Sequence, residues 1–109
     1  MESILTYLRQ AVAQQASDLF VVAGKAISMK KEGVIQPLEE QRAMPDDTEF
    51  LVRELYSLGG RPIDRYLATG DDDFSLSVPE LARFRVNTFR QRSSMAAVIR
   101  GVSFGIPDW

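Results

Sequence analysis

A strict alternation of apolar and polar residues in the second half of the chain constrains its fold more than any other feature. The run 74–78 alternates Phe, Leu and Val with serine, and the run 83–91 alternates apolar residues with arginines and other polar residues. A period of two residues is that of a strand with one buried face and one face in water. Because a Pro79-Glu80 turn separates the runs, we expect adjacent antiparallel strands. The same patterning predicts three core residues and one surface residue: Phe84, Val86 and Val98 inside, Asp71 outside.

Helices and further strands account for the rest of the chain. Residues 3–15 carry apolar side chains at helical spacing, and the acid-rich stretch after Pro45 begins a second helix that ends at Gly59-Gly60. The short apolar run 18–23 predicts a central strand covered on both faces. The remaining elements are a hairpin over 26–36, a short helix after Pro62 and a last strand over 95–102. This order indicates an α+β fold with helices packed on an antiparallel sheet.

The length and the residue types exclude several classes of protein. With 109 residues, the chain is expected to form a single domain with a modest core. It contains no cysteine and no histidine, which excludes disulfides, zinc fingers, thiol nucleophiles and histidine bases. No apolar run approaches the roughly 20 residues of a membrane span, and the N-terminus lacks the features of a secretory signal. We therefore expect a cytoplasmic protein.

Charge is segregated along the chain. Residues 1–80 hold eight Lys and Arg against 14 Asp and Glu, whereas residues 81–109 hold five arginines and one acid. Arginine presents a planar fork of donors that suits phosphate or carboxylate. The pattern therefore predicts either an anion site or a solvated sheet face balanced by the acidic half of the chain. The pI of about 5.1 and the scarcity of lysine argue against nucleic acid. The five arginines are Arg83, Arg85, Arg90, Arg92 and Arg100.

Two other patterns carry less weight. Gly24-Lys25 lacks the earlier glycine and the following Ser or Thr of a phosphate-binding loop, so we interpret it as a turn. The three carboxylates at 71–73 suggest a cation site, but consecutive strand residues point to opposite faces and converge poorly on one ion. No nucleophile–base pair can be assembled from the spacing. We therefore expect neither a metal site nor a catalytic centre in this chain.

Residues 71–100 carry a specific motif. Asp73 to Pro79 is DFSLSVP, Arg83 to Arg92 is RFRVNTFRQR, and Ala96 to Arg100 is AAVIR. This series closely resembles the N-terminal domain of the type IV pilus retraction motors, the PilT-like branch of the type II/IV secretion ATPases. Ala16-Ser-Asp-Leu19 and two later glycines also match the family spacing. The resemblance covers essentially the whole chain.

Three positions in or just before the first hairpin depart from the family pattern. Phe20 stands where the family usually has histidine, Ala26 where it has proline, and Lys30 where it has arginine. We therefore expect a changed contact at the first hairpin, whereas the arginine-rich segment is intact.

The resemblance implies a PAS-like domain over residues 1–104, with 105–109 as the start of a linker to a RecA-like ATPase core that lies outside this sequence. It also implies homohexamers at the cytoplasmic face of the inner membrane, beside the pilus platform, in which the domain packs on core domains of its own and neighbouring subunits. Arginines of this domain then contact the phosphates of ATP, bound with Mg²⁺ at the domain junction. Mapped by motif, these are Arg85 and Arg100, with Arg90 and Arg92 as second choices. The chain by itself is then expected to hold no cofactor and to catalyse nothing.

The leading interpretation is thus a nucleotide-sensing and subunit-packing domain of a hexameric ATPase. Two other functions stay open at this point. A stand-alone PAS-like module would bind a small ligand or take part in signalling, and an arginine-rich sheet would bind oligonucleotides with a steep salt dependence. The resemblance also leaves open whether such a motor retracts a pilus, assembles one or drives secretion.

Overall fold

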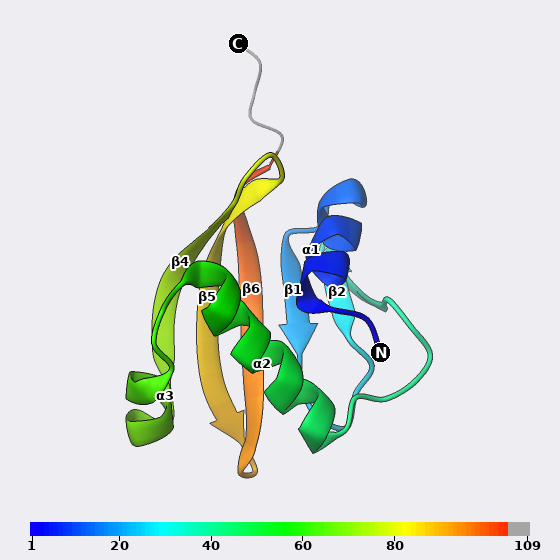
Figure 1. Cartoon of the computed structure of the whole chain (residues 1–109). Coiled ribbons are helices and arrows are strands. Elements are labelled where there is room, and N and C mark those ends of the chain that lie inside the picture. The colour runs from blue at the N-terminus through cyan, green and yellow to red at the C-terminus, as the bar shows by residue number, and fades with distance from the viewer. Residues whose placement is uncertain (105–109) are drawn as a thin grey trace.

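The computed structural model describes residues 1–104, with side chains through residue 101, and shows a six-stranded antiparallel sheet (Figure 1). The strands lie in the order β3-β2-β1-β6-β5-β4. α1 (Ile4–Ala13) and α2 (Pro45–Gly59) cross one face of the sheet, and α3 (Asp64–Thr69) lies beside β4. The α+β prediction is confirmed, and the predicted linker 105–109 lies outside the described residues. The strands are β1 (Asp18–Val21), β2 (Ser28–Lys31), β3 (Val34–Pro37), β4 (Asp72–Val78), β5 (Ala82–Gln91) and β6 (Ser94–Phe104).

The two alternating runs form β4 and β5 in the predicted antiparallel pairing. Phe74 lies opposite Val86, and Leu76 lies opposite Phe84. Phe84 and Val86 are only 2% and 0% exposed, as the alternation predicts, and Asp71 lies at the surface. The period of two therefore determines which face of these strands is buried.

The prediction for β6 is wrong at one position. Val98 is only half-buried and points away from the core, whereas its neighbours Ala97 and Ile99 are buried. Ile99 lies opposite Val86 in the pairing of β6 with β5, which sets the inward-facing residues of the strand. The run 95–99 is apolar at both odd and even positions, so periodicity could not distinguish the two sets.

β1 lies inside the sheet as predicted, but only one of its faces is covered. Leu19 and Val21 are 1% and 0% exposed beneath the helices, while Phe20 on the other face is half-buried. No helix among the described residues packs on that second face (Figure 1). The prediction of cover on both faces is therefore wrong, because a short apolar run cannot distinguish one covered face from two.

We call this uncovered side of the sheet the open face. It is formed by the side chains that alternate with the core residues along the strands. Its members include Asp18, Phe20, Ser28, Lys30, Ile35, Asp73, Ser75, Ser77, Arg83, Arg85, Asn87, Phe89, Ala96, Val98 and Arg100.

Two tight turns set the register of their strands. The β2–β3 turn consists of Glu32 and Gly33, at φ 52° and 80°. The β5–β6 turn consists of Arg92 and Ser93, at φ 53° and 71°. Positive φ at both central residues is typical of the two-residue hairpin turns whose twist matches that of a sheet. The second turn places the arginine-rich strand β5 directly against β6.

Capping residues set the ends of the two long helices. Ser3 precedes α1, and its Oγ accepts a hydrogen bond of 3.2 Å from a backbone N–H of the first turn. α2 begins at Pro45, where the Asp47 carboxylate accepts a 2.8 Å hydrogen bond from the N–H of Met44. It ends at Gly60, whose φ of 63° closes the last turn. Across the described part of the chain, no helix is both long and apolar enough to cross a membrane.

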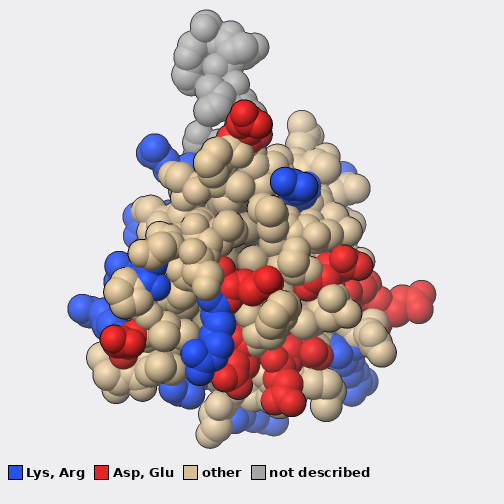
Figure 2. Space-filling model, in the orientation of Figure 1, with Lys and Arg blue, Asp and Glu red and all other residues tan. Residues whose placement is uncertain are grey.

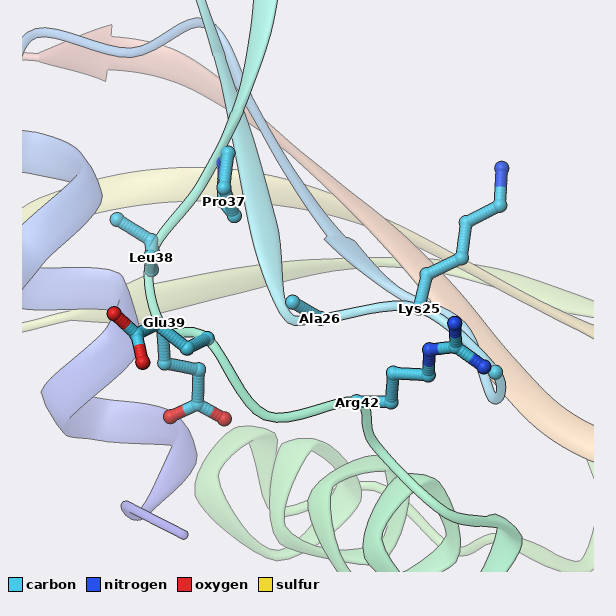
Figure 3. Close-up of a pocket in the computed structure, with 8 residues that line it drawn as sticks. Lys25, Ala26, Pro37, Leu38, Glu39 and Arg42 are labelled. Atoms are coloured by element: carbon cyan, nitrogen blue, oxygen red, sulfur yellow. The ribbon is translucent and has the colours of Figure 1, made fainter.

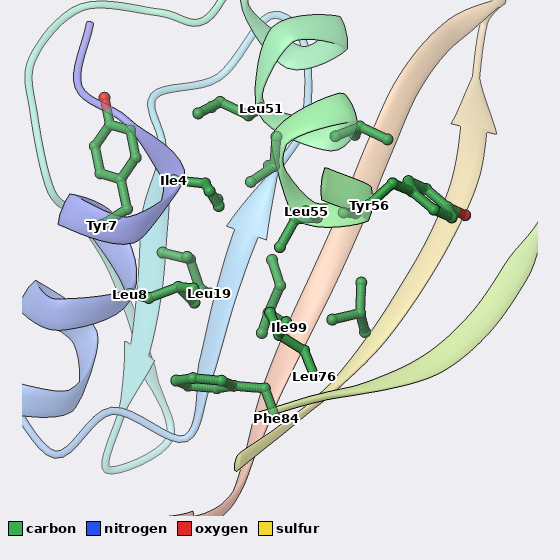
Figure 4. Packing of buried hydrophobic residues seen from close by; sticks show 14 of the residues in the cluster. Ile4, Tyr7, Leu8, Leu19, Leu51, Leu55, Tyr56, Leu76, Phe84 and Ile99 are labelled. Atoms are coloured by element: carbon green, nitrogen blue, oxygen red, sulfur yellow. The ribbon is translucent and has the colours of Figure 1, made fainter. Parts of the chain in front are cut away.

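The core lies between these helices and the covered face of the sheet (Figure 4). Each helix buries one apolar stripe against side chains of the strands. Because both stripes face the same side of the sheet, the open face has no partner within the described residues. The residues labelled in Figure 4 are Ile4, Tyr7, Leu8, Leu19, Leu51, Leu55, Tyr56, Leu76, Phe84 and Ile99.

Candidate functional site

Arg85 and Arg100 lie directly opposite each other on the open face. They are Cα partners in the pairing of β5 with β6, and side chains at such positions rise from Cα atoms about 5 Å apart. The alternation of β5 and the short β5–β6 turn together produce this placement. The structure thus brings together the two arginines that the sequence motif singled out.

Each arginine of the pair contacts one carboxylate. Nη2 of Arg85 lies 3.2 Å from Oδ2 of Asp73, and Nε of Arg100 lies 3.4 Å from Oδ1 of Asp18. The two arginine side chains are nevertheless 58% and 73% exposed. A guanidinium carries five N–H donors, so most donors of the pair remain available to a ligand.

The arrangement contributes little to the stability of the fold. Like charges directly opposite each other on a sheet destabilise it. The ion pairs offset this by no more than about 1 kcal/mol each, since both arginines are exposed, although Asp18 is itself largely buried. An incoming phosphate or carboxylate would replace these weak contacts with bidentate ones. Arg85 and Arg100 therefore form a candidate anion-binding site.

The other two arginines predicted as contacts lie apart from this pair. Arg90 follows Arg85 by five residues, or about 17 Å of strand. Its guanidinium carbon lies 5.6 Å from the centre of the Tyr66 ring, beside α3. Arg92 occupies the β5–β6 turn. The structure therefore divides the predicted set into one pair and two separate residues.

A second charged cluster, which the sequence patterns did not indicate, is buried around Asp72. Nε and Nη2 of Arg61 each lie 2.9 Å from a different carboxylate oxygen of Asp72, whose side chain is 2% exposed. The hydroxyl of Tyr56 donates to Asp72 Oδ2 at 3.0 Å and lies 2.8 Å from Oγ1 of Thr88. Asp72 has the same parity as Phe74 along β4, so the alternation itself could have placed it on the covered face.

This buried cluster joins α2 and the loop after it to β4 and β5. The hydrogen bonds from Arg61 hold the pKa of Asp72 at about 2, well below its ordinary value. Burial raises the pKa of Tyr56 to about 12. Both groups therefore keep one protonation state across the physiological range, and their donors and acceptors are paired with each other. The cluster is structural, and its carboxylate is not free to hold a cation.

Comparison with known proteins shows that the fold resembles that of pilus ATPases. No protein-family model matches the chain. The type IV pilus ATPase PilU of Pseudomonas aeruginosa is 31% identical over 100 residues, covering 92% of this chain and 26% of PilU. The crystal structure of the pilus retraction motor PilT with bound ADP superimposes with a TM-score of 0.84 and 31% identity, covering 99% of this chain and 31% of PilT. The domain belongs with the N-terminal domains of the PilT-like ATPases.

A more distant structure shares the fold of this PilT-like domain. The Legionella pneumophila ATPase DotB superimposes with a TM-score of 0.73 at 19% identity, over 98% of this chain and 31% of DotB. The chain spans only about a quarter to a third of the length of these proteins.

One hollow of the PilT-like domain lies apart from the arginine pair. It has a volume of about 700 Å³ and lies between the β1–β2 connection and the loop that leads to α2 (Figure 3). Lys25 and Arg42 extend from one side of it, and Glu39 lies on the other. Glu39 accepts a 2.7 Å hydrogen bond from the hydroxyl of Tyr7. The opposite charges that line this hollow are thus separated, and the hollow offers no convergent set of groups for one ligand.

The helix side of the PilT-like domain differs in charge from the open face. Figure 2 looks onto the helices and shows carboxylates gathered over α2 and near α1. On α2 they are Asp46, Asp47, Glu49 and Glu54. The acids of α2 and the arginine pair therefore lie on opposite sides of the sheet.

Proposed function

We propose that this domain contacts nucleotide phosphates through Arg85 and Arg100 when it is joined to an ATPase core. One observation carries the proposal: the two residues are direct cross-strand partners on the uncovered face of the sheet. The relatives are named as ATPases, and the PilT structure holds ADP. In this proposal the domain senses nucleotide for a hexameric motor that powers pilus retraction or related secretion.

The chemistry of the pair suits a polyphosphate. Two guanidinium forks present parallel N–H donors to phosphate oxygens and stay charged when water leaves. Closure of a core domain over the open face lowers the local dielectric and strengthens these contacts, as in arginine fingers. Among residues 1–101, no three Asp or Glu side chains come together as a metal site, and the proposal concerns the phosphates alone.

The proposed partners follow from the same face. The part of the open face around Arg85 and Arg100 packs on a RecA-like core domain of the same or a neighbouring chain in a homohexamer. The assembly then lies at the cytoplasmic side of the inner membrane, against the pilus platform, and has no nucleic-acid partner. The support is the lack of helical cover on this face together with the ATPase relatives.

Steady-state kinetics of hexamers that carry this domain ahead of their core test the proposal. Arg85→Ala and Arg100→Ala should each lower kcat more than they raise KM, by roughly 10²- to 10³-fold, since the two residues share the role. Replacement with Lys should restore only part of the rate, because an ammonium lacks the planar fork. Arg83→Ala is the matched control on the same strand. Parental rates for both alanine variants would refute the nucleotide role.

The isolated domain offers an independent check. It should hydrolyse no ATP, and it should bind ATP no more tightly than about millimolar, because two exposed arginines supply only a few contacts. In an NMR titration with ATP, amide shifts should centre on Arg85 and Arg100 and disappear in the double alanine variant. Shifts centred elsewhere would contradict the assignment of the site.

A further inference from the structure

A small apolar hollow opens at the end of the open face, away from the arginine pair. Its volume is about 180 Å³. Along the chain, its lining residues Phe20 and Val22 follow Asp18, the residue that contacts Arg100, by two and four residues. Four residues of extended strand span about 13 Å. The lining residues are Phe20, Val22, Lys25, Ala26, Ser28, Ile35 and Gln91.

The walls of this hollow expose apolar surface to solvent. Ile35 on the edge strand β3 is 61% exposed, and Phe20 and Val22 are half-buried. Lys30 lies on the same face as Phe20 but does not line the hollow.

The volume of the hollow limits the size of the group that can occupy it. Sites for small molecules and cofactors usually enclose about 300–1,000 Å³. A volume of about 180 Å³ is too small for such a ligand but accommodates a single aliphatic or aromatic side chain. Pockets that take one apolar anchor are typical of the energetic centres of protein interfaces.

The charge around the hollow indicates which residues should flank that anchor in the partner. The ammonium groups of Lys25 and Lys30 form no ion pair within the described residues. Asp18, the carboxylate that shares this part of the open face, is 10% exposed and already contacts Arg100. Lys25 at the hollow and Lys30 near it therefore have side chains without an ion pair, and carboxylates beside the anchor would complement them.

We propose that the hollow is a docking site for an acidic protein segment that inserts one apolar side chain. The anchor contacts Phe20, Val22 and Ile35, and its neighbouring carboxylates face Lys25 and Lys30. This goes beyond the phosphate role of Arg85 and Arg100 and does not rest on it, because none of the lining residues belongs to that pair.

An NMR titration of the ¹⁵N-labelled domain with a defined peptide tests the docking site. The probe is a capped pentapeptide with a central leucine flanked on each side by one Glu and one Asp. The controls are the same peptide with serine in place of leucine, and a version with lysine in place of every acid. We expect the acidic leucine peptide to shift the amides of Phe20, Val22 and Ser28, and each control to bind at least about fivefold more weakly.

Matched variants distinguish binding at the hollow from nonspecific binding. Ile35→Ser should weaken binding by about fivefold or more, whereas Val34→Ser should not, although Val34 is 57% exposed on the neighbouring position of β3. Lys25→Glu should weaken binding, and Arg9→Glu on α1 should leave it unchanged. Equal binding of the serine peptide, or equal loss in Ile35→Ser and Val34→Ser, would overturn the proposal. Parental amide spectra outside the site establish that each variant is folded.

Discussion

Asp72 and Asp73 are neighbours on one strand, yet they belong to different environments. Asp72 points to the covered face, is 2% exposed at its side chain and is held by Arg61 and Tyr56. Asp73 points to the open face, is 56% exposed and contacts Arg85 at 3.2 Å. The same contrast holds across the sheet, where one face packs against helices and the other presents arginines. The pleat of a strand therefore separates residues that stabilise the fold from residues that remain available for binding.

The contribution of an arginine–carboxylate contact to stability therefore depends on where in the fold it lies. On the covered face, the Arg61–Asp72 contact is bidentate and completes the hydrogen bonding of a buried group. On the open face, the contact between Arg85 and Asp73 is a single exposed one, which a ligand can displace at small cost. Burial, rather than residue type, distinguishes the two.

The largest expected effect contrasts two phenylalanines of β5. Phe84→Ala should lower the free energy of unfolding by about 3–5 kcal/mol, because it leaves a cavity beneath the helices. Phe89→Ala on the open face should lower it by at most about 2 kcal/mol, since that side chain is only half-buried. Urea denaturation of both variants measures the difference. Equal losses would mean that the open face is as well packed as the covered one.

A smaller effect is expected from the two aspartates. Asp72→Asn should lower the free energy of unfolding by about 2–3 kcal/mol, because it removes the charge that binds Arg61 in a buried setting. Asp73→Asn should change it by less than about 0.5 kcal/mol. Urea denaturation at neutral pH compares the two, and a large loss in Asp73→Asn would remove the distinction between the faces.

The pH dependence of the free energy of unfolding provides a second measurement that distinguishes Asp72 from Asp73. The pKa of Asp72 is about 2 in the folded domain and 3.8 ordinarily, so the unfolded chain takes up the proton at higher pH. The stabilisation from Asp72, about 2 kcal/mol, should therefore be present above about pH 4 and be lost as the pH falls towards 2. Asp72→Asn should lack this part of the acid dependence, while Asp73→Asn should retain it.

The smallest expected effect concerns the arginine pair. Arg85→Gln should change the free energy of unfolding by no more than about 0.5 kcal/mol, since its ion pair with Asp73 is exposed and the two cations repel each other. Arg100→Gln should lower it by no more than about 1 kcal/mol, since its partner Asp18 is largely buried but keeps a hydrogen bond from Ser17. Either variant is therefore suitable for binding experiments. A loss above about 2 kcal/mol in urea denaturation would make the pair structural and weaken its case as an anion site.

Much of the candidate site follows from the sequence, and part of it does not. The alternation in β5 placed Arg85 away from the core, and the motif selected Arg100 as its companion. Periodicity did not show that the two lie directly opposite each other, because that depends on the register that the Arg92-Ser93 turn imposes. It also did not separate Arg90, whose place beside Tyr66 depends on the packing of α3.

The local elements and the class of fold can be predicted from the amino-acid sequence. Helical spacing, strand alternation and turn residues act over a few neighbouring positions, so they can be recognised without knowing the partners of each segment. Three features could be seen only in the three-dimensional structure: both helices cover the same face, Asp72 binds Arg61, and Val98 points outward. These outcomes depend on which surfaces far apart in sequence are brought together. Where a run such as 95–99 is apolar at both parities, the pairing with β5 selects the buried side chains because only one register also buries the apolar face of β5.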